Sequence, residues 1–321
     1  MRVAYVSTDP GIPVWGAKGA SIHVQEMLRA FLARGAEVVL LSPRIEGIPP
    51  ADLCSVQVRE LPRAPKMAAE ERARIQLATN GAVAATLPAL GPFDLIYERH
   101  ALFSFAAMET ARDLGVASVL EVNAPLIEEQ ARHRDLALPQ DAELTARRAF
   151  QAARAVVAVT DEVAAYATRL GASPASTEVI PNAVDPARFP PRPAPEGPFT
   201  IGFLGTLKPW HDVAALLDAL PLLRRSVPEA RLLVVGDGPQ RPALEARAAA
   251  LGLTDAVAFA GAVRPDEVPG LLAGMHVAAA PYAGGTPFYF SPLKLYEYMA
   301  AGLAVVARDV GHLSTGVEAG R

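Results

Sequence analysis

The sequence predicts two α/β domains in tandem, each a doubly wound parallel sheet with helices on both faces. Short apolar runs alternate with helical patterns, and one proline-dense segment at 185–199 interrupts this alternation before it starts again. The length of 321 residues and a hydrophobic content of 51% leave room for two cores. We therefore expect an N-terminal domain at 1–186 and a C-terminal domain at 187–321, with a ligand cleft between them.

The N-terminal half opens with a strand–helix–strand unit. The apolar run at 3–7 predicts a strand, the helical spacing at 20–35 predicts a helix, and the run at 37–42 predicts the next strand. The later apolar runs predict strands at 93–97, 117–122 and 155–160, with helical patterns such as 102–114 between them.

The C-terminal half repeats this pattern after the proline-dense segment, which we interpret as a linker because proline continues neither a helix nor a central strand. The apolar runs predict strands at 201–204, 231–235, 257–259, 276–280 and 303–307. The helical patterns lie at 211–223, 239–251, 265–272 and after Ser291.

Composition and charge exclude several classes of protein. The net charge of −4 argues against a broad nucleic-acid surface, which needs clustered excess lysine and arginine. Glutamates interrupt the basic run at 59–74, so we interpret it as the solvated face of a helix. A single cysteine, Cys54, excludes an intrachain disulfide, and nothing resembles a zinc-ligand cluster.

The chain is expected to be cytoplasmic. Its first residues lack the pattern of a signal peptide, and no apolar run approaches the roughly 18 residues of a spanning helix. A reducing compartment suits a chain with a single cysteine. A peripheral contact with the inner face of the membrane stays open.

The segment from Ser291 to Gly302 carries the first functional hypothesis. Ser291 and Pro292 predict the start of a helix, and an open helix N-terminus binds anions such as phosphate. Glu297, more than a turn further in, has the oxygens to accept hydrogen bonds from two neighbouring hydroxyls. Phosphate and diol together describe a nucleotide. The alternative is an ordinary amphipathic helix with its leucines and Met299 toward a core and Glu297 in solvent; the segment alone leaves both open.

Loops at the carboxyl ends of strands hold further candidates, because ligands of open α/β sheets bind there. Gly16 and Gly19 permit close approach of a phosphate and Lys18 adds charge, or this is a plain surface loop. Lys208 and His211 follow the first strand of the second half. A cation there would stabilise a leaving diphosphate, whereas the alternative is a simple helix entry.

Three further positions have competing interpretations. Gly238 belongs to a tight turn first and contacts a ligand second, and Arg264 either reads a base or is simply exposed. The segments 97–100 and 121–125 end two strands and suit a polyhydroxylated acceptor. Within the latter, Asn123 either binds that acceptor or caps a helix.

Taken together, these residues resemble the GT-B glycosyltransferases of family 4, and the matching stretches follow the family's order along almost the whole chain. Such enzymes have two Rossmann-like domains facing across a cleft and move a sugar from a nucleotide-sugar donor to an acceptor. The matching stretches are 16–23, 179–185, 202–211, 232–239 and 291–302.

The resemblance implies a role for each matching residue. Glu297 corresponds to the glutamate that holds the donor ribose, and the backbone of Ser291, Pro292 and Leu293 to the segment that meets donor sugar and phosphate. The glycines of 16–19 correspond to the loop that meets the diphosphate from the acceptor-side domain.

The resemblance also implies the type of reaction. The donor would be UDP- or GDP-linked, and the acceptor would be a hydroxyl on a sugar, a lipid-linked glycan or a small molecule. The sugar keeps its anomeric configuration. No metal or other cofactor is expected, because positively charged groups of the protein take the place of a metal ion. The chain would then act in glycan or glycoconjugate biosynthesis.

Several residues depart from the family pattern. Tyr289 stands where the family has its first glutamate, near the donor-sugar hydroxyls, and Asn123 replaces a histidine. Thr206 and His211 stand where the family has arginine and lysine on the diphosphate. We expect a subgroup built around a Lys-Pro-Trp-His loop, with Lys208 carrying the positive charge.

The sequence ends at Arg321, where family members continue with further helices, so we expect a donor domain truncated at its C-terminal end. Two other functions stay open. One is a nucleotide-sugar epimerase or hydrolase on the same fold, and the other is a non-catalytic protein that binds a nucleotide sugar.

Overall fold

The computed structural model describes residues 1–190, 193, 195–284, 288–311 and 313. These residues form two compact units, each described below by itself. The first unit comprises residues 1–181 and 289–291, and the second comprises the described residues of 182–288 and of 292–321.

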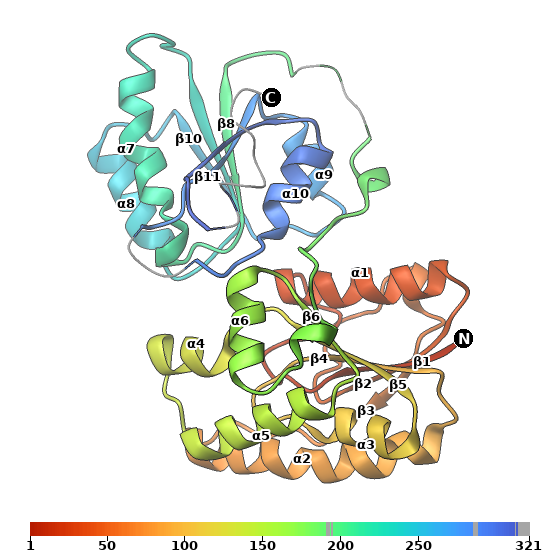
Figure 1. The fold of residues 1–321 in the computed structure, drawn as a ribbon. Helices are drawn as coiled ribbons and strands as arrows, with labels where there is room; N and C mark the ends of the chain where they lie inside the picture. The colour runs from red at the N-terminus through yellow and green to blue at the C-terminus, as the bar shows by residue number, and fades with distance from the viewer. Residues whose placement is uncertain (191–192, 194, 285–287, 312, 314–321) are drawn as a thin grey trace. The chain divides into compact units, whose positions relative to one another are not determined.

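The first unit contains a seven-stranded parallel sheet in the order β3-β2-β1-β4-β5-β6-β7 (Figure 1). Its strands are β1 (Arg2–Ser7), β2 (Glu37–Ser42), β3 (Gln57–Glu60), β4 (Leu95–Arg99), β5 (Ala117–Val122), β6 (Ala155–Ala158) and β7 (Thr177–Val179). Its helices are α1 (Gly19–Ala33), α2 (Ala69–Leu90), α3 (Ala106–Leu114), α4 (Leu126–His133), α5 (Pro139–Ala152) and α6 (Asp161–Arg169).

Alternation along the strands places apolar side chains on both faces of this sheet. Tyr5 and Leu40 are fully buried on the face that α1 covers through Leu28. Val6 is fully buried on the opposite face, in a cluster that includes Met108 of α3. Burial on both faces explains why the central strands β1 and β2 are almost continuous apolar runs in the sequence.

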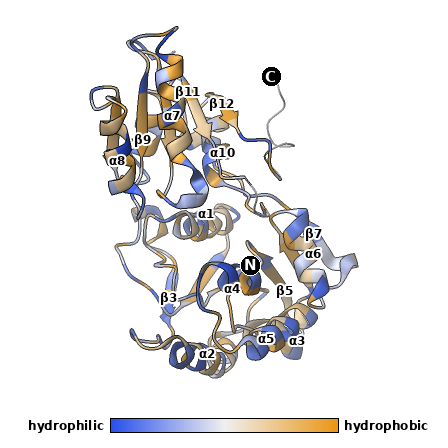
Figure 2. Ribbon diagram, turned by 90° about the vertical axis from the view of Figure 1, so that its left-hand side faces the viewer, coloured by the Kyte–Doolittle hydropathy of each residue, from blue (hydrophilic) through white to orange (hydrophobic). Residues whose placement is uncertain are grey.

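The second unit contains a five-stranded parallel sheet in the order β10-β9-β8-β11-β12. Helices α7 and α8 cover one face, and α9 and α10 cover the other (Figure 1). Its strands are β8 (Thr200–Leu204), β9 (Arg231–Val235), β10 (Val257–Gly261), β11 (Val277–Ala280) and β12 (Ala304–Ala307). Figure 2 shows the hydrophobic residues of β9 and β12 in orange. Its helices are α7 (Val213–Leu223), α8 (Arg241–Ala250), α9 (Val268–Leu272) and α10 (Leu293–Ala300).

In each sheet the strand order reverses at one place. The reversal lies between β1 and β4 in the first unit and between β8 and β11 in the second. Loops that leave neighbouring strands there diverge to opposite faces, and the crevice between them is where doubly wound sheets bind ligands. The loops after these four strands therefore position the candidate sites.

A short segment that is distant in sequence completes the first unit. Residues 289–291 belong to the first unit, although the described residues on both sides of them belong to the second. Tyr289 is only 4% exposed, in the same apolar cluster as Phe150 and Tyr166. Its hydroxyl donates to Glu129 Oε2 at 3.0 Å, and its carbonyl accepts from the Thr160 hydroxyl at 3.3 Å.

The predicted pair of doubly wound parallel sheets is confirmed, while several details differ. Strands β3 and β7 were absent from the prediction. The basic run at 59–74 is not one helix face, because Arg59 lies on β3 and α2 begins only at Ala69. The helix expected at 102–114 begins at Ala106, after a loop in which Phe103 has a φ of 67°.

No helix within the described ranges is long and apolar enough to cross a membrane. Cys54 is exposed and unpaired, in line with the absence of an intrachain disulfide.

Candidate functional site

The carboxyl edge of the first sheet is organised around one buried carboxylate, Glu121 of β5, which is 3% exposed. It accepts hydrogen bonds from the Tyr97 hydroxyl at 3.0 Å and from Asn123 Nδ2 at 2.7 Å. It also forms ion pairs with His23 of α1 and, at 3.5 Å, with Arg99 Nη1. Burial alone would raise the pKa of Glu121, but these neighbours lower it to about 2. The cluster is thus a fixed anion that orients four donors.

This cluster decides between the two interpretations of Asn123. Helix α4 begins at Leu126, its N-terminal flanking residue is Pro125, and no side chain caps it. The amide of Asn123 instead binds Glu121. The helix-cap interpretation is therefore wrong. Asn123 follows β5, the neighbour of β4, and the acceptor interpretation stays a prediction.

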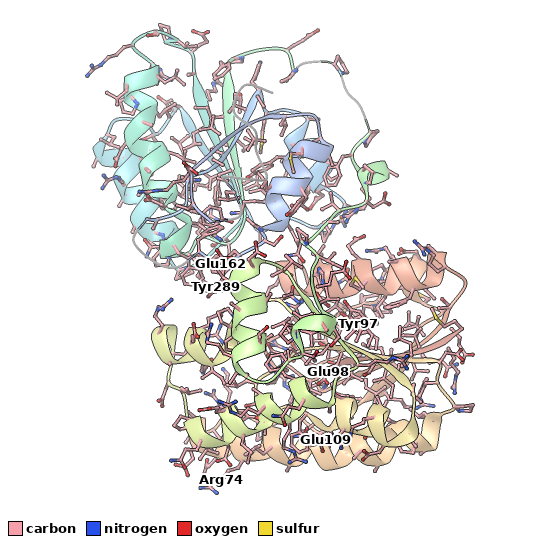
Figure 3. The ribbon with its side chains drawn as sticks, viewed as in Figure 1. Arg74, Tyr97, Glu98, Glu109, Glu162 and Tyr289 are labelled. Carbon is pink, nitrogen blue, oxygen red and sulfur yellow. The ribbon has the colours of Figure 1, made fainter. Side chains whose placement is uncertain are left out.

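Glu98 and His100 do not join this edge. Glu98 faces the other side of the sheet from Tyr97, because successive side chains of a strand alternate (Figure 3). The ring centre of His100 lies 4.9 Å from that of Phe150, in the apolar cluster on that other side. Glu98 is fully buried and accepts a hydrogen bond from the Ser104 hydroxyl. Burial raises the pKa of Glu98 to about 7 and, with the nearby charge of Arg99, lowers the pKa of His100 to about 4. The expectation that all of 97–100 lines a ligand wall is therefore wrong for these two residues.

Glu98→Gln is expected to change how stability depends on pH. Because the folded-state pKa of Glu98 is raised to about 7 from 4.5, its stabilising contribution is full below pH 4.5 and is lost as pH rises to 7. Glutamine does not titrate, so the stability of the variant relative to wild type should rise by about 3 kcal/mol between pH 4.5 and 8. Urea unfolding at both pH values measures this. A relative stability that is the same at both would contradict a buried, titrating Glu98.

The loop after β1 is built on glycine and on Gln25, which sequence reasoning missed. Gln25 is 4% exposed, and its Nε2 donates to the carbonyls of Val14 at 2.8 Å and Gly16 at 2.9 Å. A Cβ at Gly16 would lie 2.8 Å from the Pro13 ring, so the tight backbone needs glycine. Lys18 is exposed just before α1, and nothing lies within 4 Å of a Cβ at Gly19. The loop thus presents backbone and a lysine to solvent.

In the second unit, the loop after β8 is bonded to the turn after β9. The N–H of Gly205 donates to Val235 O at 2.9 Å, and the N–H of Leu207 donates to Asp237 O at 2.9 Å. A Cβ at Gly238 would lie 2.6 Å from Leu207 O, so a side chain there would separate loop and turn. Gly238 is therefore a packing glycine as well as a candidate contact.

The Lys-Pro-Trp-His loop carries its two candidate groups differently. His211 ends a 3-10 turn at Pro209–His211, and its Nδ1 is hydrogen-bonded to the Thr206 carbonyl. Burial and the positive charges of Lys294 and Lys208 lower the pKa of His211 to about 3, so the ring is neutral at physiological pH. The ammonium of Lys208 lies 5.6 Å from the centre of the Trp210 ring.

Helix α10 does not bury the face that a simple amphipathic pattern predicts. Lys294, Leu295 and Tyr298 are buried, whereas Met299 is 41% exposed. The alternative that points Met299 toward a core is therefore wrong. Glu297 is half-buried one turn into the helix, close enough to Lys294 to interact with its charge.

Lys294 is a second residue that sequence reasoning missed. A lysine between two leucines on a short helix is typical of a solvent-facing position. Glu297 follows three residues later, a spacing that is typical of an ion pair on a helix surface. Only the three-dimensional structure shows that the side chain points inward.

The remaining candidates fall into two groups. Arg264 is 73% exposed and pairs with Asp266 at 3.0 Å, in agreement with the interpretation of a plain surface arginine. Tyr289 and Ser291 are buried in the first unit, and the Tyr289 hydroxyl donates a hydrogen bond to Glu129.

Among the residues that the structure describes, no group of three or more His, Cys, Asp or Glu is arranged to hold a metal ion.

Comparison with known proteins relates the chain to glycosyltransferases. The family described as Glycosyltransferase Family 4 matches residues 17–188, and Glycosyl transferases group 1 matches residues 198–321. A 2-deoxystreptamine glucosyltransferase from Streptomyces kanamyceticus is 34% identical over 52% of this chain and 46% of its own length. A D-inositol 3-phosphate glycosyltransferase from Jonesia denitrificans is 28% identical over 94% of this chain and 77% of its own length.

Solved structures show the same fold. HepE from Anabaena in complex with UDP has a TM-score of 0.68 at 19% identity and covers 99% of this chain and 83% of its own. Sucrose-phosphate synthase from Thermosynechococcus elongatus has a TM-score of 0.72 at 18% identity over 98% and 83%. The chain spans less than half the length of the first curated relatives, 46% and 39%.

Proposed function

Because the chain belongs to Glycosyltransferase Family 4, we propose that it transfers a hexosyl group, with retention of configuration, from a UDP- or GDP-linked sugar to a hydroxyl acceptor. One observation in the second unit carries this proposal. The Gly205–His211 loop, the Gly236–Gly238 turn and helix α10 follow three adjacent parallel strands, β8, β9 and β11. The carboxyl edge of the strands is where a doubly wound sheet binds a nucleotide.

The donor roles follow from positions along α10. Its first turn, preceded by Ser291 and Pro292 and beginning at Leu293, offers N–H groups to phosphate and donor sugar. Glu297 lies half-buried one turn further along the helix, and its carboxylate accepts hydrogen bonds from the two ribose hydroxyls. A UDP-glucose complex is known for HepE, which agrees with a nucleotide-sugar donor.

The acceptor roles fall to the first unit. The fixed Glu121 cluster holds Asn123 and Arg99 at the strand ends, where amide and guanidinium groups bind hydroxyls. Two of the relatives act, by their names, on 2-deoxystreptamine and on an inositol phosphate, which are ring polyols. A polyhydroxylated ring is therefore the acceptor class we favour, free or attached to a lipid.

In the proposed reaction, the acceptor oxygen bonds to the anomeric carbon on the face from which the diphosphate leaves. The bond between that carbon and the diphosphate oxygen breaks, and the acceptor proton passes to the departing diphosphate. Dipolar groups of the Thr206–His211 loop and the N–H groups at the start of α10 stabilise the developing negative charge, so the proposed reaction requires no metal.

A panel of sugar nucleotides offered with ring-polyol acceptors tests the proposal. We expect nucleotide release to depend on the acceptor, and one nucleoside diphosphate to raise the melting temperature. NMR of the product should show that the anomeric configuration of the donor sugar is retained. EDTA should change none of these results. Isomerised or free sugar without acceptor dependence would indicate an epimerase or hydrolase instead. A folded protein that no nucleoside diphosphate stabilises would refute the proposal.

Glu297→Ala is expected to weaken binding of the nucleoside diphosphate by about 10- to 100-fold, because the ribose hydroxyls lose a charged acceptor. Titration calorimetry with UDP and GDP measures the change. Met299→Ala is the matched control, since Met299 lies two residues away on the same helix and is 41% exposed. Equal affinities for both variants would remove Glu297 from the site.

A further inference from the structure

The ammonium group of Lys294 is buried without a hydrogen-bond partner among the described residues. The side chain is 8% exposed, and its Nζ lies 4.2 Å from the centre of the Phe203 ring and 5.2 Å from that of Tyr282. Ring faces replace part of the lost hydration of a cation, but they leave the three N–H donors unused. A buried charge in this state is costly unless an anion binds it.

The position of Lys294 is as informative as its burial. A Cβ at Gly205 would lie 2.8 Å from Lys294 Nζ, so the ammonium touches the loop that follows β8. This loop and helix α10, which follows β11, flank the place where the strand order of the second sheet reverses. The unpartnered cation therefore lies at the crevice that the sheet topology assigns to a ligand.

His211 shares this environment. Its ring centre lies 5.8 Å from that of Phe203 and 5.4 Å from that of Tyr282, the same two rings that contact Lys294. Lys208, by contrast, lies half-buried beside Trp210. Of the two lysines, Lys294 is therefore the one whose ammonium is buried without a hydrogen-bond partner among the described residues.

We propose that Lys294, and not Lys208, supplies the principal positive charge that binds the diphosphate of the donor. The proposal rests on the proposed function and names the residue that takes the place of the missing arginine and lysine of the family. Because Nζ is covered in this structure, the ammonium turns out from between Phe203 and Tyr282 on its flexible four-carbon stem to donate to the phosphate oxygens.

Proton uptake should accompany this binding. Burial lowers the pKa of Lys294 to about 7, with Glu297 on its own helix opposing the shift. The loop after β8 adds Lys208 and the neutral His211, and the loop after β11 adds the Tyr282 hydroxyl. A bound diphosphate stabilises the ammonium form, so binding at pH 7.5 should take up on the order of half a proton.

The experiment compares wild type, Lys294→Met and Lys208→Met by titration calorimetry with UDP, GDP and inorganic pyrophosphate in Tris and HEPES at pH 7.5. Lys294→Met should weaken binding of each diphosphate that wild type binds by about 10- to 100-fold and abolish the proton uptake. Lys208→Met should change the affinity by less than about threefold.

Stability separates a binding role from a structural one. Methionine has a similar length and no charge, so Lys294→Met should leave the melting temperature of the ligand-free protein unchanged or raise it by up to about 5 °C. A melting temperature lowered by several degrees would assign Lys294 to the core and overturn the inference.

The remaining outcomes separate the inference from the proposed function. Wild-type binding of pyrophosphate through Lys294 without binding of UDP or GDP would support the anion site and refute the nucleotide-sugar donor. Nucleotide binding that Lys294→Met leaves unchanged would support the donor and overturn the role of Lys294. Binding of none of the three ligands by folded wild type would overturn both.

Discussion

Gly236→Ala should destabilise the second unit by about 3 kcal/mol or more. Gly236 has a φ of +132°, which residues with a side chain rarely adopt, and a Cβ there would lie 2.0 Å from the carbonyl oxygen of Gly205. The clash is with backbone, so no rotamer change relieves it. Either the turn after β9 or the loop after β8 has to move, and both belong to the candidate donor site.

The two tryptophans allow this to be measured. Trp15 lies in the first unit and Trp210 in the second, so a Trp15→Phe background leaves one fluorescent reporter of second-unit unfolding in urea. Gly252→Ala is the matched control, because Gly252 has a φ of +66° and nothing within 4 Å of its Cβ. The control should cost about 1 kcal/mol. If both variants lose the same free energy of unfolding, the close contact between position 236 and the Gly205 carbonyl does not contribute to stability.

Asn80→Ala is expected to destabilise the first unit by about 3 kcal/mol. Asn80 of α2 is 7% exposed, and its Oδ1 accepts from the N–H groups of Phe105 at 2.9 Å and Ala106 at 3.0 Å. Its Nδ2 donates to the Phe103 carbonyl at 2.8 Å. A side chain of one helix thus caps the start of α3, and alanine leaves these buried backbone groups without partners at about 1–3 kcal/mol each.

Unfolding followed by Trp15 fluorescence in a Trp210→Phe background measures this loss. Thr79→Ala is the neighbouring control. Among the residues that the structure describes, the Thr79 hydroxyl bonds only within its own helix, to the Ile75 carbonyl at 3.0 Å. A loss for Asn80→Ala no larger than for Thr79→Ala would show that solvent replaces the missing cap.

The strands that the sequence predicted well are those buried on both faces. The runs at 37–42, 117–122 and 231–235 have the bounds of β2, β5 and β9, because a short run made mainly of apolar and β-branched residues has few other structures open to it. The missed strands, β3 and β7, lie at the two edges of the first sheet and are short and largely polar. Backbone pairing creates such strands, and it leaves no apolar pattern to detect.

The candidate site was predictable in location but not in chemistry. The loop at 205–211 follows β8, one of the two strands between which the strand order reverses, and Gly238 packs against this loop. The inward direction of Lys294 and the outward direction of Met299 depend on the angle at which α10 packs, which helical spacing does not specify. Likewise, Asn123 looked equally suited to a cap until the position of Glu121 two residues earlier was known.

The segment 289–291 also has a consequence for the order of events during biosynthesis. The core of the first unit includes Tyr289, yet residue 181 is the last of its continuous part. About 100 residues must therefore be synthesised before that core is complete, which takes roughly 5 to 20 s at 5–20 residues per second. Until then the nascent first unit leaves open the place where Tyr289 will pack. Its final stability is reached only after translation has passed most of the second sheet.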